Sequence, residues 1–346
     1  MKTAVVLFNL GGPDSKESIK PFLFNFFMDK NIIRAPLPVR WMVANLIAIR
    51  RSKREAGESY GELGDKSPLL ENSQQQAKAL EEKLGADHKV FICMRYWHPM
   101  ADEVAQQVKD YDPDKIILLP LYPQYSTTTT RSSLQTWKAA CGKVDLYKPE
   151  SIVCCYPWED GFIRASAANV KTVYDQALAE CGEAPRVLFS AHGLPEDVIT
   201  DGDPYQWQCE MTAEKIAAAT GIDYLDWQIC YQSRVGPKKW IGPSTEEALD
   251  KAIADGVPVV ILPHAFTQEH VETLVEIEVE YREIAEHKGI KGFYRVPTVG
   301  THAEFIKGLY NMVKSAERRE GILPDTGARL CPQEFCRCAM DEKRGF

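Results

Sequence analysis

The stretch "VLFSAHGLP" at residues 187–195 carries the pattern that decides the fold. Its apolar residues run without polar alternation, which is typical of a strand buried on both faces of a parallel sheet. The following His-Gly-Leu-Pro sequence predicts that the chain turns directly after the strand. His192 would then lie at the carboxyl end of a strand, where proteins of the α/β class bind ligands. The alternative is a histidine with a structural role in the turn.

Further apolar stretches alternate with amphipathic segments along nearly the whole chain. The expected strands are 4–10, 90–95, 115–121, 152–156, 186–191, 227–232, 257–263 and 292–296. The expected helices include 72–84, 100–110, 161–180, 205–220, 245–254 and 269–287. Continuous apolar strands separated by helices predict βαβ units and buried parallel sheets. So many strands would overcrowd one sheet, and we therefore expect an α/β fold with two doubly wound, Rossmann-like lobes.

The length of 346 residues also favours two domains. We place an N-terminal α/β lobe at residues 1–148, with an apolar segment at about 20–54. A C-terminal α/β lobe at 149–304 carries His192 and Glu272, and a helix with a cysteine-containing tail at 305–346 packs back on the body.

Composition and charge exclude several classes of protein. The net charge of −8 argues against a nucleic-acid partner, which would require a basic surface. The apolar run at 4–10 is closed by a Gly-Gly-Pro turn and does not resemble a secretory signal. No stretch reaches the roughly 18 apolar residues of a membrane-spanning helix. We therefore expect a cytoplasmic protein whose ten cysteines are mostly thiols.

The stretch "EHVETLVEIEVEYREIAEH" at 269–287 predicts an acidic helix. A helical period places four apolar side chains on the core face: Leu274, Ile277, Tyr281 and Ile284. The same period aligns three carboxylates: Glu272, Glu276 and Glu280. Like charges four residues apart destabilise a helix by a few tenths of a kcal/mol per pair, on the order of 0.3. The stripe therefore favours a hydrated divalent cation or a route for protons, with a solvated helix face as the alternative.

Two loops have the composition of ligand-binding segments. In "QSRVGPKKWIGPS" at 232–244, Trp240 stands between two Gly-Pro pairs, which favours a stacking surface for a flat ligand. The alternative is a tryptophan that covers the edge of the core. In "YPQYSTTTTRSSL" at 122–134, hydroxyl groups and Arg131 precede a helix, where backbone N–H groups can hold an anion. The alternative is an ordinary helix cap.

The tail "LCPQEFCRCAM" at 330–340 contains Cys331, Cys336 and Cys338 in the spacing C-x4-C-x-C. A terminal tail gives no packing reason for three thiols, so the spacing favours metal or iron–sulfur ligation. The C-x2-C pairs of zinc sites are missing. A cluster held by four cysteines would need one more thiol from the body of the protein.

Taken together, these motifs resemble the ferrochelatase family. The motifs that carry the resemblance are "NLGGP" (9–13), "MRYWHP" (94–99), "YPQYSTTTTRSSL" (122–134), "FSAHGLP" (189–195), "GDPYQWQ" (202–208), "CYQSRVGPKKWIGPST" (230–245) and "FTQEHVETLVEIEVEY" (266–281). They occur in the family's order and cover nearly the whole chain. The resemblance implies a two-lobed chelatase fold with a porphyrin cleft between the lobes. It also implies insertion of Fe2+ into protoporphyrin IX with release of two protons, the last step of haem biosynthesis.

The resemblance also implies roles for individual residues. His192 matches the catalytic histidine, and Glu272 matches a catalytic glutamate that faces it across the macrocycle. These two residues, together with Glu276 and Glu280, are the candidate ligands of the incoming metal. The candidate porphyrin-binding residues are Met94, Arg95, Tyr96, Ser126, Thr127, Trp240, Phe266 and His270.

The apolar, basic segment 22–54 matches the lips of the cleft, which can touch a membrane surface. Its cations are Arg34, Arg40, Arg50, Arg51, Lys53 and Arg54. Phe22, Leu23 and Trp41 are among the residues expected to meet lipid or an oily ligand, which favours peripheral contact with the inner membrane. A pair of core-facing amphipathic helices is the alternative.

The tail resembles that of the cluster-containing members, with one departure. In animal members the internal cluster cysteine lies in the stretch that matches "YPQYSTTTT", where this chain has Thr127. A [2Fe-2S] cofactor would therefore be held by Cys331, Cys336, Cys338 and a cysteine from elsewhere, for which Cys155 is our choice before Cys154 and Cys141.

Three other functional points stay open at this stage. The substrate could be another tetrapyrrole such as coproporphyrin III, and a porphyrin or haem carrier would need the aromatic residues but not the acidic stripe. The sequence is compatible with a monomer or a homodimer.

Overall fold

The computed structural model describes residues 1–55, 60–234 and 238–341, without the side chains of residues 54 and 55. The chain forms two compact units. Unit 1 comprises Met1–Cys155, Tyr310–Leu330 and the residues from Ala339 onward, and unit 2 comprises Tyr156–Leu309 and Cys331–Cys338. The sequence placed the first boundary after residue 148, whereas the chain leaves unit 1 after Cys155.

Some residues named in the sequence analysis lie outside this description. They are the side chain of Arg54, the first Gly-Pro pair at 236–237 and the end of the tail at 342–346.

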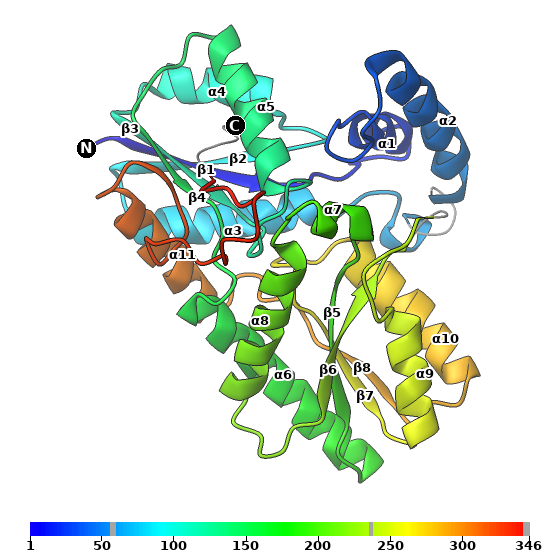
Figure 1. Ribbon diagram of the computed structural model, residues 1–346. Helices are drawn as coiled ribbons and strands as arrows, with labels where there is room; N and C mark the ends of the chain where they lie inside the picture. Colours follow the sequence, from blue (N-terminus) through cyan, green and yellow to red (C-terminus); the bar gives the residue numbers. More distant parts are fainter. Residues whose placement is uncertain (56–59, 235–237, 342–346) are drawn as a thin grey trace. The chain divides into compact units, whose positions relative to one another are not determined.

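Unit 1 is built on a parallel sheet of strand order β2-β1-β3-β4-β9. Its strands are β1 (Thr3–Asn9), β2 (His88–Met94), β3 (Lys115–Pro120), β4 (Glu150–Val153) and β9 (Gly321–Leu323). In register, Val5 of β1 pairs with Val90 and Ile117. Helix α3 (Leu69–Leu84) lies on one side of this sheet, and α4 (Ala101–Tyr111) and α5 (Thr130–Lys143) lie on the other (Figure 1). Every residue of β1 is buried because both faces of the sheet are covered.

Unit 2 has a second parallel sheet, of order β6-β5-β7-β8. Its strands are β5 (Arg186–His192), β6 (Trp227–Gln232), β7 (Val259–Pro263) and β8 (Phe293–Arg295). Helices α6 (Asp160–Cys181) and α8 (Tyr205–Ala219) cover one face, and α9 (Thr245–Asp255) and α10 (Arg282–His287) cover the other (Figure 1). The prediction of two parallel α/β sheets is therefore confirmed.

The other helical segments connect these layers. They are α1 (Ile19–Phe27), α2 (Leu37–Glu55), η1 (Gly61–Leu63), α7 (Glu196–Thr200), η2 (Glu272–Tyr281) and α11 (Ala303–Ala316).

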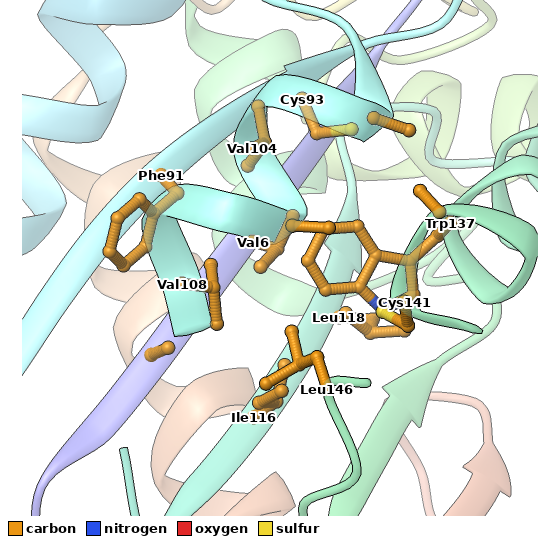
Figure 2. Close-up of a cluster of buried hydrophobic side chains, with 14 of the residues drawn as sticks. Val6, Phe91, Cys93, Val104, Val108, Ile116, Leu118, Trp137, Cys141 and Leu146 are labelled. Atoms are coloured by element: carbon orange, nitrogen blue, oxygen red, sulfur yellow. The ribbon is translucent and has the colours of Figure 1, made fainter. Parts of the chain in front are cut away.

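The core of unit 1 shows how the apolar strands become buried. Side chains from β1, β2 and β3 meet the apolar faces of α4 and α5 in one cluster of buried residues (Figure 2). The rings of Phe8 and Trp137 pack edge to face, with their centroids 6.1 Å apart. Aromatic pairs of this geometry contribute about 1 kcal/mol beyond the area that they bury.

Each expected strand is present, but three features differ from the expectation. Strand β9 was missed, because three residues, "GIL", give too short an apolar run to signal a strand. Residues 272–281 form a π-helix instead of an α-helix, and only 282–287 are α-helical. Leu274 was wrongly placed in the core. The wider turn leaves it half-buried, whereas Ile277 and Tyr281 do belong to a buried cluster.

Candidate active site

His192 is the last residue of β5, and the turn after it is held on both sides. The N–H of Gly193 donates to the carbonyl of Gln232, and the N–H of Ile241 donates to the carbonyl of Leu194. A Cβ atom on Gly193 would lie 2.8 Å from the Gln232 carbonyl oxygen, so a larger residue would force the strands apart. Glycine is therefore required for the close approach that fixes the backbone next to His192.

His192 and Glu272 are in direct contact. The imidazole Nδ1 lies 3.0 Å from Oε2 of Glu272, and the side chains keep 33% and 25% of their surface exposed. The hydroxyl of Tyr205 donates to the backbone carbonyl of His192 at 3.0 Å, which fixes the strand end from the opposite side. A carboxylate beside an imidazole orients the ring and stabilises its protonated form. The pair can therefore accept a proton and hold the resulting charge.

The contact between these two residues corrects one expectation. The resemblance implied that Glu272 faces His192 across the macrocycle. A 3.0 Å hydrogen bond leaves no space for a flat ring between the two side chains.

Glu272 opens the π-helix η2, and the wider turn changes which side chains are neighbours. In an α-helix, side chains three or four residues apart meet. Here the hydroxyl of Tyr281 donates to Oε1 of Glu276, five residues earlier, at 3.1 Å. π-helical turns are rare and are often found at functional sites. The turn directs Tyr281, which the sequence assigned to the core, toward the acidic stripe.

Gln232, the last residue of β6, links the strand of His192 to this helix. Its Oε1 accepts from Ser190 Oγ at 2.8 Å, two residues before His192. Its Nε2 donates to the Glu272 carbonyl at 3.2 Å and to Oε2 of Glu276 at 3.0 Å. One fully buried amide therefore fixes β5 and both glutamates relative to one another.

Glu276 is held by neutral donors. Ser233 Oγ donates to its Oε2 at 2.6 Å, in addition to the donors from Gln232 and Tyr281. Burial raises the pKa of Glu276 and the nearby charge of Glu272 raises it further, while the Ser233 hydrogen bond opposes both effects. Glu278, two residues on, instead pairs with an arginine, Arg295, at 3.0 Å. Glu276 and Glu278 therefore differ in their partners, and burial favours the protonated form of Glu276.

Glu280 lies at the exposed end of the stripe. The three predicted carboxylates therefore run from a partly exposed Glu272, through a largely enclosed Glu276, to the exposed Glu280. Nowhere in the described ranges do three His, Cys, Asp or Glu side chains gather as a ready metal site. His192 and Glu272 thus form a pair, not a complete ligand set.

His270 and Phe266 lie just before η2. The Phe266 and His270 rings pack edge to face at 4.6 Å. His270 is buried, and its Nδ1 accepts the backbone N–H of Glu272 at 3.0 Å. Burial lowers the pKa of His270, so the ring is neutral at physiological pH. Its role in the structure is to cap the first turn of the helix that carries Glu272.

Trp240 lies beside the turn that follows His192. Pro195 and Trp240 form an isolated β-bridge, and a Cβ atom on Gly193 would lie 3.4 Å from the indole ring. The ring is half-exposed, which suits the predicted stacking surface. The structure thus brings Trp240, His192 and Glu272 together within unit 2.

The remaining predicted site residues belong to unit 1. Met94 and Tyr96 are buried, and Arg95 is half-buried beside them. Ser126 and Thr127 are also buried. The Ser126 hydroxyl accepts the backbone N–H of Thr128 at 3.1 Å in a local turn before α5. The N-cap residue of α5 is Thr129, which makes no side-chain cap hydrogen bond.

The predicted cluster cysteines do not form a ligand set in this structure. Cys155 packs in a buried cluster with Tyr125, Cys154 and Ala339. No three of the described His, Cys, Asp or Glu side chains gather as a metal site. Gln208 Nε2 donates to the sulfur of Cys331 at 3.2 Å, and the Cys336 thiol donates to the Asp201 carbonyl at 3.4 Å. The sulfur atoms of Cys154 and Cys155 are 3.9 Å apart. The described thiols therefore do not fit the predicted [2Fe-2S] cofactor as they stand.

A family model described as ferrochelatase matches residues 2–317. The chain belongs to the ferrochelatase family. A protein named ferrochelatase from Wolbachia sp. subsp. Drosophila simulans is 50% identical over 317 residues, which are 90% of this chain and 98% of that protein. A ferrochelatase from Hyphomonas neptunium is 46% identical over 350 residues, which are 99% of this chain and 95% of that protein.

Two solved structures share the fold of this ferrochelatase-family chain. SirB from Bacillus subtilis with Fe3+ has a TM-score of 0.53 at 10% identity, with 92% of this chain and 96% of that chain covered. The sirohydrochlorin chelatase SirB in complex with cobalt has a TM-score of 0.51 at 11% identity, with the same coverage. At such low identity the likeness supports the fold alone.

Several residues at this family member's site were not found from the sequence. Gln232 and Ser233 stand at the end of a strand within "CYQSR", and their polarity at that position was the available signal. Tyr281 could not be found, because an α-helical period places it on the core face. Tyr205 also gave no signal, because its hydroxyl meets a backbone carbonyl that is distant in sequence.

Proposed function

We propose that the chain is a metal chelatase, a lyase that inserts Fe2+ into protoporphyrin IX to form haem, with release of two protons. The observation that carries the proposal is the direct contact of His192 with Glu272 at the end of β5, in a chain of the ferrochelatase family. Ferrous iron and porphyrin are the substrates. The pyrrole N–H protons must leave as iron enters, so the site needs a base.

We assign the role of base to His192. When Nδ1 donates to Glu272, the other ring nitrogen carries the lone pair that can take a pyrrole proton. The Glu272 carboxylate then stabilises the imidazolium. Imidazole nitrogen and carboxylate oxygen are also ligands for ferrous iron. Because the macrocycle supplies the remaining nitrogens, the protein needs to offer only a partial ligand set.

Glu276 and Glu280 are proposed to continue from this pair toward solvent, as a path for protons or for iron. The support is the order of their exposure, with Glu280 exposed and Glu276 enclosed by donors from Gln232 and Ser233. A carboxylate held by hydrogen bonds keeps its position while a proton or an iron ion moves along the line. This acidic line distinguishes a chelatase from a passive porphyrin carrier.

For the porphyrin, we propose the residues that the family resemblance indicated. They are Trp240, Phe266 and His270 in unit 2, and Met94, Arg95, Tyr96, Ser126 and Thr127 in unit 1. The half-exposed indole of Trp240 beside the His192 turn is the best-supported member. A flat, apolar macrocycle is held by such aromatic faces.

We further propose that α2 meets a membrane surface. Phe22 and Leu23, expected to meet lipid or an oily ligand, are buried and offer no surface to lipid. The exposed apolar residues of α2 are instead Leu37, Val39, Trp41, Met42, Leu46 and Ile49. Arg50 and Lys53 are exposed at the same helix's later turns. Large exposed apolar residues beside cations suit an interfacial helix.

None of the helices formed by the described residues combines the length and hydrophobicity needed to cross a membrane. We propose peripheral contact of α2 with the inner membrane from the cytoplasmic side, on the basis of its exposed apolar residues and cations. Sedimentation with vesicles of anionic lipid tests it. Leu46→Glu should reduce the bound fraction, and equal binding of the variant would refute the contact.

The proposed [2Fe-2S] cluster rests on the tail spacing and on the resemblance to cluster-containing family members, with Cys331, Cys336 and Cys338 as ligands and Cys155 as the fourth. The described geometry does not support it. Iron and acid-labile sulfide assayed on protein purified without oxygen decide the matter. Absence of both in folded protein would leave an ordinary thiol-rich tail.

Anaerobic incubation with Fe2+ and protoporphyrin IX tests the function itself. The free-base fluorescence should disappear at a rate proportional to the protein concentration. Faster turnover of coproporphyrin III would identify a chelatase for that tetrapyrrole. Tight porphyrin binding without loss of fluorescence on addition of iron would identify a carrier.

A further inference from the structure

Asp29 follows α1 in the segment expected to form the lips, and its carboxylate is almost completely enclosed. Its side chain is 1% exposed. A buried carboxylate is costly unless hydrogen bonds and a cation compensate for the lost water. The contacts of Asp29 therefore indicate what the fold gains from placing it there.

One carboxylate oxygen closes the turn between α1 and α2. Oδ1 accepts the backbone N–H of Asn31 at 2.8 Å and the Asn31 side-chain amide at 3.0 Å. The carbonyl of Asp29 also accepts the N–H groups of Ile32 and Ile33. Oδ1 and the carbonyl oxygen of Asp29 together set the direction in which the chain leaves α1.

The other oxygen binds the body of unit 1. Oδ2 accepts from Arg95 Nη2 at 2.9 Å, from the Tyr96 hydroxyl at 2.7 Å and from the Ser132 hydroxyl. Arg95 Nε also donates to Ser132 Oγ at 2.6 Å, which closes a ring of contacts. Arg95 and Tyr96 follow β2, and Ser132 lies in the first turns of α5.

Packing strengthens the same connection. The rings of Phe26 and Tyr96 meet edge to face at 4.9 Å, and Asn25 Nδ2 donates to the Tyr96 carbonyl at 3.1 Å. Helix α2, which presents the exposed apolar residues, packs on α1. The position of α2 therefore depends on how the end of α1 is fixed.

We propose that Asp29 is a positioning residue that fixes the α1–α2 pair to the strand ends of unit 1 and orients Arg95 and Tyr96 for the porphyrin. The inference rests on the proposed function, since these two side chains are porphyrin-binding candidates only within it. Asp29 itself touches no substrate and takes part in no step. Its loss therefore acts on substrate binding and on the order of the helix pair, not on the chemical step.

Asp29→Asn tests this role with a side chain of the same size. The amide of the variant carries no charge. If its NH2 group takes the place of Oδ2, this donor faces the donors of Arg95, Tyr96 and Ser132. We expect KM for porphyrin to rise about tenfold, the factor equal to about 1.4 kcal/mol, while kcat stays within about twofold. Hydrogen–deuterium exchange of the amides of residues 31–52 should become faster, with β5 unchanged. Asp110→Asn, an exposed aspartate on α4, is the matched control and should change neither value.

Ser132→Ala covers the case in which Asp29→Asn does not fold. It removes one donor to Oδ2 and leaves the charges in place. We therefore expect a smaller rise in KM and a smaller increase in the exchange rates of residues 31–52. If the folded variants keep the wild-type KM and the wild-type exchange rates, the proposal is overturned. A fall in kcat as large as the expected rise in KM, without faster exchange, would also overturn it. If the wild-type protein inserts no iron, the proposed function fails, and porphyrin binding and exchange still decide the role of Asp29.

Discussion

Each unit has a group of polar residues that meet near its strand ends, and the two groups differ in exposure. In unit 1, Asp29, Arg95 and Tyr96 meet one another, and the Tyr96 hydroxyl is directed to a buried acceptor. In unit 2, His192 and Glu272 also meet, but about a third and a quarter of their surfaces stay exposed. A polar group satisfied inside the fold maintains structure, whereas a paired group that keeps an exposed surface can react.

Breaking the exposed pair gives the largest expected effect. Glu272→Gln keeps the size of the side chain and removes the charge that stabilises protonated His192. We expect kcat for iron insertion to fall about 100-fold, at the lower end of what general acid–base catalysis contributes. Stopped-flow loss of porphyrin fluorescence measures it. A variant with wild-type kcat would show that the pair does not handle protons.

Gln232→Met sharpens the comparison by changing a buried residue of unit 2. The apolar side chain of similar length loses the contacts to Ser190, the Glu272 carbonyl and Glu276. We expect kcat to fall about tenfold, because small misplacements of reacting groups are costly. Gln228→Met, on the half-exposed part of the same strand, is the control. Equal losses in both variants would assign the effect to general damage of β6.

Tyr281→Phe removes the hydroxyl that donates a hydrogen bond to Glu276. Burial already raises the pKa of Glu276, and loss of a donor to its carboxylate raises it further. A group with a raised pKa stays protonated to higher pH, so activity that needs ionised Glu276 is lost earlier as pH falls. The acid limb of the pH profile should shift upward, with about a twofold loss at neutral pH. If the acid limb of the pH profile is unchanged, ionisation of Glu276 does not control the rate of iron insertion.

Glu317→Gln in unit 1 should affect stability alone. Glu317 lies 2.5 Å from Lys314 and from His88. Burial raises its pKa, but the hydrogen bonds from Lys314 and His88 outweigh that effect and hold the pKa below the usual range. A depressed pKa adds stability at neutral pH that is lost as pH falls through the folded-state value. The variant should lose about 1 kcal/mol of unfolding free energy at neutral pH and less in acid. Thermal unfolding followed across pH measures the difference, and kcat should not change.

The strands and the residues that follow them could be predicted because continuous apolar runs and strand-end loops are local patterns. His192, Glu272 and Trp240 were found in this way, and the structure brings them together in unit 2. The π-helix was not predictable, because "VETLVEIEVEY" fits an α-helical period and tertiary contacts select the wider turn.

Partners far apart in sequence explain the other failures. Asp29 was a single acid in an apolar, basic segment, and its contacts come from residues 66 and 103 positions away. No spacing rule connects such positions. Phe22 and Leu23 were expected to meet lipid or an oily ligand, with the core as the alternative, because a short amphipathic helix does not reveal which side meets the core.

The central claim is that His192 takes the pyrrole protons with Glu272 beside it. The most direct measurement is the anaerobic rate of Fe2+ insertion by His192→Ala, with porphyrin affinity determined by fluorescence titration on the same protein. The expected result is porphyrin affinity near that of the wild type and a rate reduced by at least about 100-fold. Insertion at the wild-type rate by a variant that binds porphyrin normally would contradict the claim.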